Sequence, residues 1–176
     1  MFTMSSTPVR TGFVSMWISA AFLIALVVNG VQSERSSDIG RKCPNGWEKF
    51  GTRCFKYFSD LKPWAEAEKQ CVGLGGNLAS IHSQLAHNFL KTLVIKHGND
   101  NSRAWIGAHD AIKEDIWFWS DGSEFEYSDW HTGEPSNGGG NERCVEMGYG
   151  GEKRWNDAHC DTLLNFICYR TTKIHF

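Results

Sequence analysis

The hydrophobic positions form one unbroken apolar run, followed by a long mixed region. Residues 13–28 read FVSMWISAAFLIALVV without a charged side chain, and Arg10 precedes them. A charged start, an apolar centre and a small residue such as Ser33 shortly afterwards are typical of a secretory signal peptide. The run of about 16 residues is shorter than the roughly 20 that cross a bilayer. We therefore expect removal of residues 1–33 on secretion and no stable membrane insertion, with an uncleaved anchor as the alternative.

The mixed region begins with a short polar segment, residues 34–42, which we expect to be a frayed terminus. Residues 47–50 and 54–58 then have strand character, with partial alternation in the second stretch, and Gly51-Thr52 lies between them. This pattern predicts a β-hairpin with one buried face.

Two segments have helical periodicity. In the first, Ser59-Asp60-Leu61 and Pro63 give a helix start, and the helix places Trp64 and Cys71 on one face before it stops near Gly73. The second begins at Ser83 and ends before Gly98. Its apolar positions, which we expect to face the core, are Leu85, Phe89, Leu93 and either Val94 or Ile95.

The second half of the chain contains short apolar stretches around a long polar segment. Strand-like stretches occupy residues 104–108, 116–119, 144–147 and 166–169. Residues 121–151 are rich in Gly, Asn, Ser and acidic side chains, and they are far longer than an ordinary connection. Such a loop is either functional or disordered.

Length and charge narrow the class of protein. The chain has 176 residues, which suits one ordinary domain with a real core. Without residues 1–33 it retains 17 basic and 20 acidic side chains, a formal charge of −3. A mildly acidic surface argues against a nucleic-acid partner, because phosphate binding rests on a basic patch.

The cysteines indicate disulfides. Six are present, at positions 43, 54, 71, 144, 160 and 168. An even number behind a signal peptide predicts three disulfides, although six cysteines allow fifteen connectivities and spacing alone does not choose among them. Zinc binding is excluded, since no two cysteines lie the two to four residues apart that zinc ribbons and fingers require.

The long loop and the segment after it concentrate oxygen-bearing side chains. They are Glu134, Ser136, Glu142, Asn156 and Asp157. None is a soft ligand, and carboxylate and amide oxygens are what a hard cation such as Ca2+ binds. We expect these residues to lie in one glycine-rich, exposed region and to form a calcium site.

Several of these motifs resemble those of the C-type lectin family. The shared features, in the family's order, are Trp105-Ile106-Gly107, Trp130, Glu134-Pro135, Cys144, Trp155-Asn156-Asp157, Cys160 and Cys168. The resemblance implies a C-type lectin-like domain over residues 43–170, similar to small secreted fish lectins and type II antifreeze proteins. The implied fold is α+β, with two helices, antiparallel sheets and a long calcium-binding loop. The implied disulfides are Cys43–Cys54, Cys71–Cys168 and Cys144–Cys160.

The resemblance also implies how the site works. Glu134, Ser136, Glu142, Asn156 and Asp157 would bind both Ca2+ and two neighbouring sugar hydroxyls, and the bond before Pro135 would be cis. In the family, Glu-Pro-Asn favours mannose-type sugars and Gln-Pro-Asp favours galactose. Glu134 therefore predicts a mannose-type preference. Ser136 departs from both triplets, so we expect calcium to be retained and sugar affinity to be altered.

Some relatives have an auxiliary calcium site, and Asp110 and Glu114 match two of its positions. Arg143 and Asn137 stand where further acids are expected, and a cation is a poor metal ligand. We interpret Asp110 and Glu114 as surface acids.

The remaining residues do not suggest catalysis. No serine or cysteine has a recognisable activating partner, and most tryptophans occupy positions where core packing is the commoner role. The sequence therefore predicts a secreted, calcium-dependent lectin of innate immune recognition that is not an enzyme. The alternative is a related domain that binds ice or a protein instead of sugar. Self-association into a homo-oligomer is left open.

Overall fold

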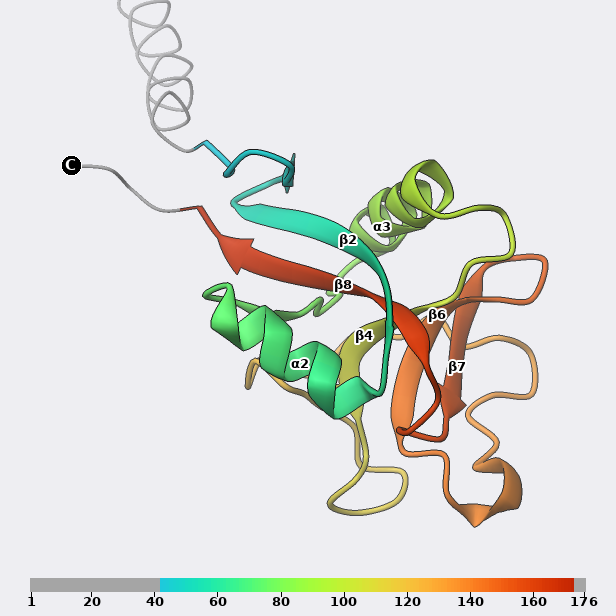
Figure 1. Cartoon of the computed structure of the whole chain (residues 1–176). Coiled ribbons are helices and arrows are strands. Elements are labelled where there is room, and N and C mark those ends of the chain that lie inside the picture. The colour runs from blue at the N-terminus through green and yellow to red at the C-terminus, as the bar shows by residue number, and fades with distance from the viewer. Residues whose placement is uncertain (1–41, 173–176) are drawn as a thin grey trace, which may run out of the picture. The chain divides into compact units, whose positions relative to one another are not determined.

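The computed structural model describes residues 42–172 (Figure 1). The predicted signal peptide and all but the last residue of the polar segment 34–42 lie outside these residues. No helix within the described part is long and apolar enough to cross a bilayer. In chain order the elements are β1 (Glu48–Phe50), β2 (Arg53–Lys62), α2 (Trp64–Gly73), β3 (Asn77–Leu78), α3 (Gln84–His97), β4 (Ala104–His109), β5 (Phe118–Trp119), the 3-10 helix η1 (Gly138–Gly140), β6 (Cys144–Tyr149), β7 (Arg154–Ala158) and β8 (Leu164–Thr171).

The strands form one sheet in the order β1-β2-β8-β4-β6-β7, with β3 attached to β8 and β5 to β4. The β1–β2 hairpin confirms the prediction, with Lys49 opposite Cys54. The strand pairs are antiparallel, as the resemblance implied, except that β4 and β8 pair in parallel. The last strand enters the middle of the sheet, between β2 and β4, as Figure 1 shows.

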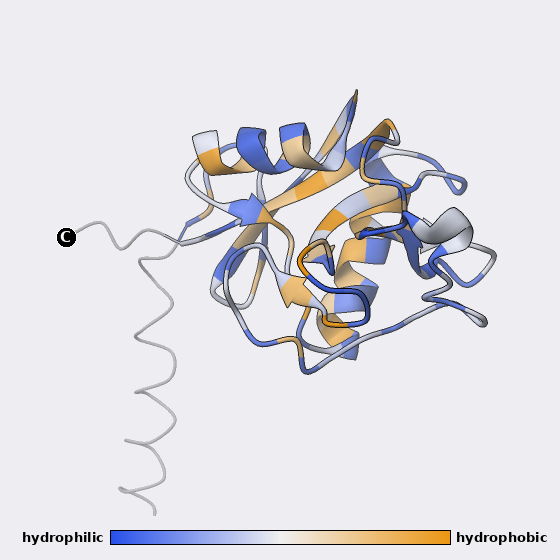
Figure 2. Cartoon of the chain, turned by 90° about the horizontal axis from the view of Figure 1, so that it is seen from below, coloured by the Kyte–Doolittle hydropathy of each residue, from blue (hydrophilic) through white to orange (hydrophobic). Residues whose placement is uncertain are grey.

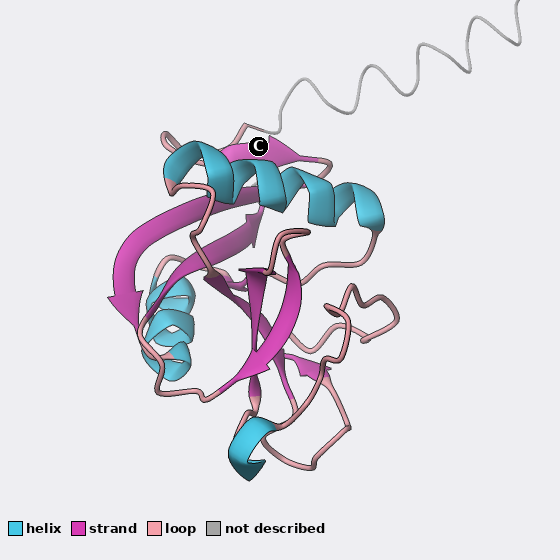
Figure 3. Cartoon of the chain, turned by 90° about the vertical axis from the view of Figure 1, so that its right-hand side faces the viewer, coloured by secondary structure: helices cyan, strands magenta, loops and turns pink. Residues whose placement is uncertain are grey.

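The two helices pack against the sheet (Figure 3), and the buried apolar residues form two clusters. Helix α3 packs against β2 and β6, and helix α2 against β3, β4 and β8. Figure 2 shows apolar residues along the strands and both apolar and polar residues on the helices, whereas the long loops are mainly polar. The fold is therefore α+β, as the resemblance implied.

The core-facing side of α3 differs from the prediction. Ser83 caps the helix by accepting the amide of Ala86, which fixes its start as expected. However, Leu85 is 72% exposed and Ile95 is 42% exposed. The side chains that α3 buries are His87, Leu90, Leu93 and Val94. Leu93 and Val94 are thus confirmed, whereas Leu85 was wrong, because apolar character alone does not reveal burial.

Two boundaries also differ from the prediction. Ser59, Asp60 and Leu61 belong to β2, and α2 begins only at Trp64, after Pro63. A proline fits just before the first helical turn because its missing N–H is not needed there. The strand expected over residues 116–119 is reduced to Phe118–Trp119.

The three implied disulfides are all present: Cys43–Cys54, Cys71–Cys168 and Cys144–Cys160. The first joins the start of the domain to β2, and the second joins α2 to β8. The third connects the start of β6 to the segment just after β7, so it lies directly beneath the long polar loop.

Candidate functional site

The predicted site lies along the outer edge of β7. The loop over residues 131–143 follows this edge, because a bridge joins Trp130 to Trp155 and the amide of His131 donates to the carbonyl of Trp155 at 2.8 Å. Trp155 is fully buried and contacts four aromatic rings of the core. Trp155 therefore packs beneath the loop and supports the start of it through these backbone contacts.

Asp157 anchors the loop to β7. Its Oδ1 accepts the backbone amide of Ser136 at 2.9 Å, and its Oδ2 accepts the amide of Asn137 at 2.7 Å. Asp157 is 1% exposed and Asn156 is 7% exposed. The expectation that both lie in an exposed, glycine-rich region was therefore wrong. Both belong to the buried strand β7, which was not predicted because two adjacent polar residues are not typical of a strand.

Glu134 lies beside Asp157, and no positively charged side chain in the part of the chain that the structure describes offsets its charge. The bond between Glu134 and Pro135 is cis, as the resemblance implied. The Oε2 atom of Glu134 is buried without a hydrogen-bond partner. Burial, together with the nearby carboxylates of Asp157 and Glu142, raises the pKa of Glu134, while a hydrogen bond with Ser136 opposes the rise. The charges of Asp157 and Glu142 thus disfavour a charge on Glu134.

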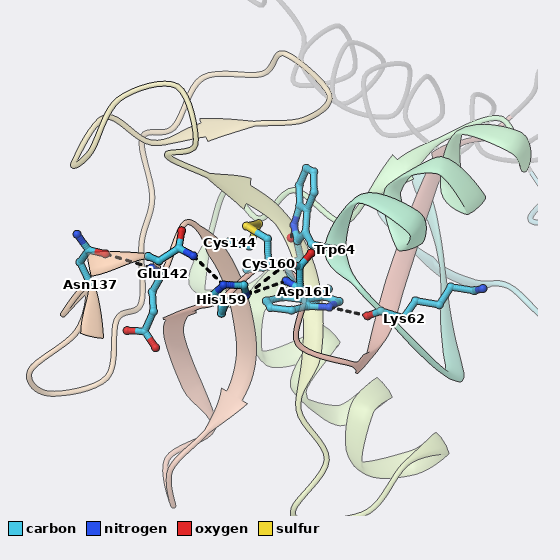
Figure 4. The surroundings of a disulfide bond; sticks show 11 residues. Lys62, Trp64, Asn137, Glu142, Cys144, His159, Cys160 and Asp161 are labelled. Atoms are coloured by element: carbon cyan, nitrogen blue, oxygen red, sulfur yellow. Dashed lines mark hydrogen bonds and ion pairs between the residues drawn. A yellow bond between two sulfur atoms is a disulfide. The ribbon is translucent and has the colours of Figure 1, made fainter. Parts of the chain in front are cut away.

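The far side of the loop is organised by Asn137 and Glu142. Asn137 has φ of 46° and accepts the amide of Glu142 through Oδ1 at 3.1 Å. Glu142 in turn accepts the amide of Gly138 at 2.5 Å. A Cβ at Gly138 would come 2.8 Å from Glu142 Oε2, so a larger residue there would have to displace the end of that side chain. Figure 4 shows the side chain of Asn137 directed toward the backbone of Glu142.

The Cys144–Cys160 disulfide fastens the base of the same loop (Figure 4). Next to it, the ring of His159 contacts the side-chain amide of Asn141 at 2.7 Å. The loop is thus held at β7 by Asp157, and at its end by a covalent bond and a polar contact.

Asn156 follows Trp155 and precedes Asp157 on β7, but its side chain contacts Glu146 and not the loop amides that Asp157 holds. Its Nδ2 donates to Glu146 Oε1 at 2.9 Å. Glu146 is fully buried, and it also accepts a hydrogen bond from Arg103. Burial raises the pKa of Glu146, against the opposing effects of Arg103 and Asn156. Glu146 was not predicted from the sequence, although it is the one acid within an otherwise apolar strand.

The acids of the auxiliary site are only partly as expected. Glu114 is half exposed, but Asp110 is 3% exposed, so its interpretation as a surface acid was wrong. The guanidinium of Arg143 lies 3.4 Å from an oxygen of each. Glu114 also accepts the side-chain amide of Asn137 at 2.5 Å. The positive charge of Arg143 therefore balances the charges of Asp110 and Glu114. The hydrogen bond from Asn137 joins Glu114 to the loop.

The donor set fits a hard cation in its chemistry. Carboxylate, amide and hydroxyl oxygens are suitable calcium ligands, and the unpartnered Oε2 of Glu134 among like charges calls for a positive charge. Among residues 42–172, however, no three His, Cys, Asp or Glu side chains already surround one point. Both oxygens of Asp157 and one of Glu142 meet backbone amides instead. Binding would therefore draw these groups together.

Comparison with known proteins agrees with this geometry. The description "Lectin C-type domain" matches residues 60–170. The chain is 47% identical to ladderlectin of Oncorhynchus mykiss over 68% of its own length and 63% of that protein, so it spans less than two thirds of ladderlectin. It is 40% identical to the galactose-specific lectin nattectin of Thalassophryne nattereri, over 84% of this chain and 92% of nattectin.

Solved structures show the same fold. The herring type II antifreeze protein superimposes with a TM-score of 0.69 and 37% identity, covering 74% of this chain and all of that chain. The fold is thus common to proteins named for sugar binding and to proteins named for ice binding.

Proposed function

Because the chain belongs to the C-type lectin domain family, we propose that it is a secreted protein that binds carbohydrate in a calcium-dependent manner. The observation that carries this proposal is the buried, unpartnered oxygen of Glu134 beside Asp157 and Glu142. A carboxylate in that position costs free energy unless a cation pairs with it. The role is one of binding and not of catalysis.

The proposed ligands are those predicted from the sequence: Glu134, Ser136, Glu142, Asn156 and Asp157. Calcium, when bound, would supply open coordination positions for two neighbouring sugar hydroxyls. The residues themselves orient those hydroxyls, because ligand oxygens keep further lone pairs for hydrogen bonds. Ser136 is exposed and has a short side chain, so it contributes least to direct recognition.

We propose a preference for mannose-type sugars because Glu134 matches the first residue of Glu-Pro-Asn, the triplet that favours these sugars in the C-type lectin family. Galactose is the competing assignment, because nattectin is named galactose-specific. The loop segment 137–141 has no aromatic side chain on which a galactose ring could stack. This absence supports the mannose-type assignment.

Secretion and innate recognition complete the proposal. Three disulfides suit an oxidising, extracellular compartment. The apolar run at residues 13–28 supports export. A secreted lectin with this site would recognise glycans on microbial surfaces.

Ice binding is the second candidate, favoured by the likeness to the herring antifreeze protein. The loop at the candidate site is glycine-rich and carries Glu142 and Arg143, whereas ice binding needs a flat, regular surface. We therefore rank it second, and a measurement of thermal hysteresis would test it.

Retention on immobilised sugars tests the proposal. We expect the chain to bind a mannose matrix in millimolar calcium and to elute with EDTA, with weaker retention on galactose. Glu134→Gln should lose retention, because it removes one ligand charge. Retention that EDTA does not affect would contradict calcium dependence, and stronger retention on galactose would overturn only the sugar preference.

A further inference from the structure

Glu146 is the most deeply buried acid of the described residues whose position the proposed function leaves unexplained. It lies in the middle of β6, with 0% exposure, directly opposite Asn156 on β7. Its Oε1 accepts hydrogen bonds from Arg103 and Asn156, each at 2.9 Å, whereas its Oε2 is buried without a partner. Burying a half-satisfied carboxylate is costly. The fold alone therefore does not account for it.

The hydrogen bond to Glu146 fixes the orientation of the Asn156 side chain. The end of an asparagine side chain presents an oxygen on one side and an NH2 group on the other, and the two can exchange by rotation. Only the oxygen can bind a cation. Because Nδ2 donates to a carboxylate, which can only accept, the amide is fixed with Oδ1 turned away from Glu146.

The positive charge of Arg103 stabilises the buried carboxylate of Glu146. The side chain of Arg103 is 42% exposed, and it reaches the buried carboxylate from the solvent side. Charge-assisted hydrogen bonds are roughly twice as strong as neutral ones. Glu146 thus remains an acceptor toward Asn156, although it is fully buried.

We propose that Glu146 is a positioning residue of the calcium site: it orients the amide of Asn156 so that Oδ1, and not the NH2 group, is offered to the metal. This inference rests on the proposed function, because it assigns Glu146 a role only if Asn156 binds calcium. Glu146 itself does not touch the ion. Groups that orient metal ligands in this way typically contribute 10–100-fold to metal affinity.

Two substitutions at this position separate orientation from stability. Glu146→Leu removes the acceptor and fills the space, so the amide of Asn156 can rotate. We expect calcium affinity, measured by isothermal titration, to fall about 10–100-fold. The melting temperature in EDTA should fall, because the buried NH2 group of Asn156 loses its acceptor. Glu146→Gln keeps an acceptor without the charge, so its affinity should lie between those of the other two proteins.

Glu68→Leu is the matched control. Glu68 accepts the side-chain amide of Asn77 at 2.6 Å and the amide of Leu78 at 2.6 Å, far from the loop in sequence. Its loss should lower the melting temperature and leave calcium affinity unchanged. Near-ultraviolet circular dichroism verifies that each variant is folded.

The outcomes are distinguishable. If the unmodified chain binds calcium and both Glu146 variants bind it equally well, the positioning role is overturned while the proposed function stands. An equal loss of affinity in Glu68→Leu would also overturn it, since general destabilisation would then explain the effect. If the unmodified chain does not bind calcium, the proposed function fails, and the inference that rests on it fails as well.

Discussion

Asp157 Oδ1 accepts the backbone amide of Ser136 at 2.9 Å, which joins a buried strand residue to an exposed loop residue. The same carboxylate is a proposed calcium ligand. Structure and function therefore depend on one side chain, and a substitution there cannot affect binding alone.

Asp157→Ala should abolish calcium-dependent sugar binding and also destabilise the calcium-free protein. The amides of Ser136 and Asn137 would lose a charged acceptor, and such hydrogen bonds contribute about 1.5–3 kcal/mol. Urea unfolding in EDTA measures this change. Unaltered stability would show that the two hydrogen bonds do not hold the loop, and retained binding would show that the site is misplaced.

Ser136→Asn should strengthen mannose binding. The longer side chain adds an amide oxygen for calcium and an NH2 group for the sugar. One recovered hydrogen bond to a charged or polarised group is worth roughly 1.5–3 kcal/mol, or about tenfold or more in affinity. Titration of mannose and galactose onto both proteins measures it. Unchanged or weaker mannose binding would mean that serine belongs to a differently built site.

His87 should make the fold sensitive to acid. Its Nδ1 accepts from the indole of Trp155 at 3.0 Å, and its Nε2 lies 3.2 Å from Asp129. Burial lowers the pKa of His87, although the charge of Asp129 opposes this. The unfolded chain therefore takes up the proton first, near its usual pKa of about 6.5. The free energy of unfolding should fall as the pH drops below that value.

His87→Gln retains an acceptor for the indole but does not titrate, so it provides the control. The difference in unfolding free energy between the two proteins should change by up to about 1.4 kcal/mol per pH unit below pH 6.5. Parallel profiles of the two proteins between pH 7.5 and 5 would contradict a neutral, buried His87.

Removal of the Cys144–Cys160 disulfide should weaken calcium binding as well as stability. The bond spans 16 residues at the base of the loop, and its loss should cost about 3 kcal/mol. Replacement of Cys43 and Cys54, whose bond spans 11 residues away from the loop, should lower stability to a similar degree. Calcium titration should then show reduced affinity only in the first variant. Equal affinities would show that the disulfide does not order the site.

The sequence predicted most of the framework because its signals were local. The capping Ser83, the hairpin turn at Gly51-Thr52 and Pro63 beside the helix start each define a boundary by their own chemistry. The disulfide pairs were different: spacing left them open, and only the family resemblance selected among them.

What could not be predicted depended on contacts across the sheet. Asn156 and Asp157 look like loop residues, because polar neighbours give no strand alternation, yet β6 and the loop bury both. Asp110 is buried because Arg143, distant in sequence, reaches it. The role of Glu146 likewise arises from the register that sets it opposite Asn156.

Thermal unfolding in calcium and in EDTA tests the central claim most directly. A ligand that binds only the folded protein stabilises it by RT ln(1 + [Ca2+]/Kd). Extracellular calcium sites commonly have Kd values of about 10⁻⁴–10⁻³ M, so 10 mM calcium should add about 1.4–2.7 kcal/mol. We predict a higher melting temperature in calcium, and Asp157→Ala should abolish the difference. Identical melting curves in 10 mM calcium and in EDTA would contradict the account.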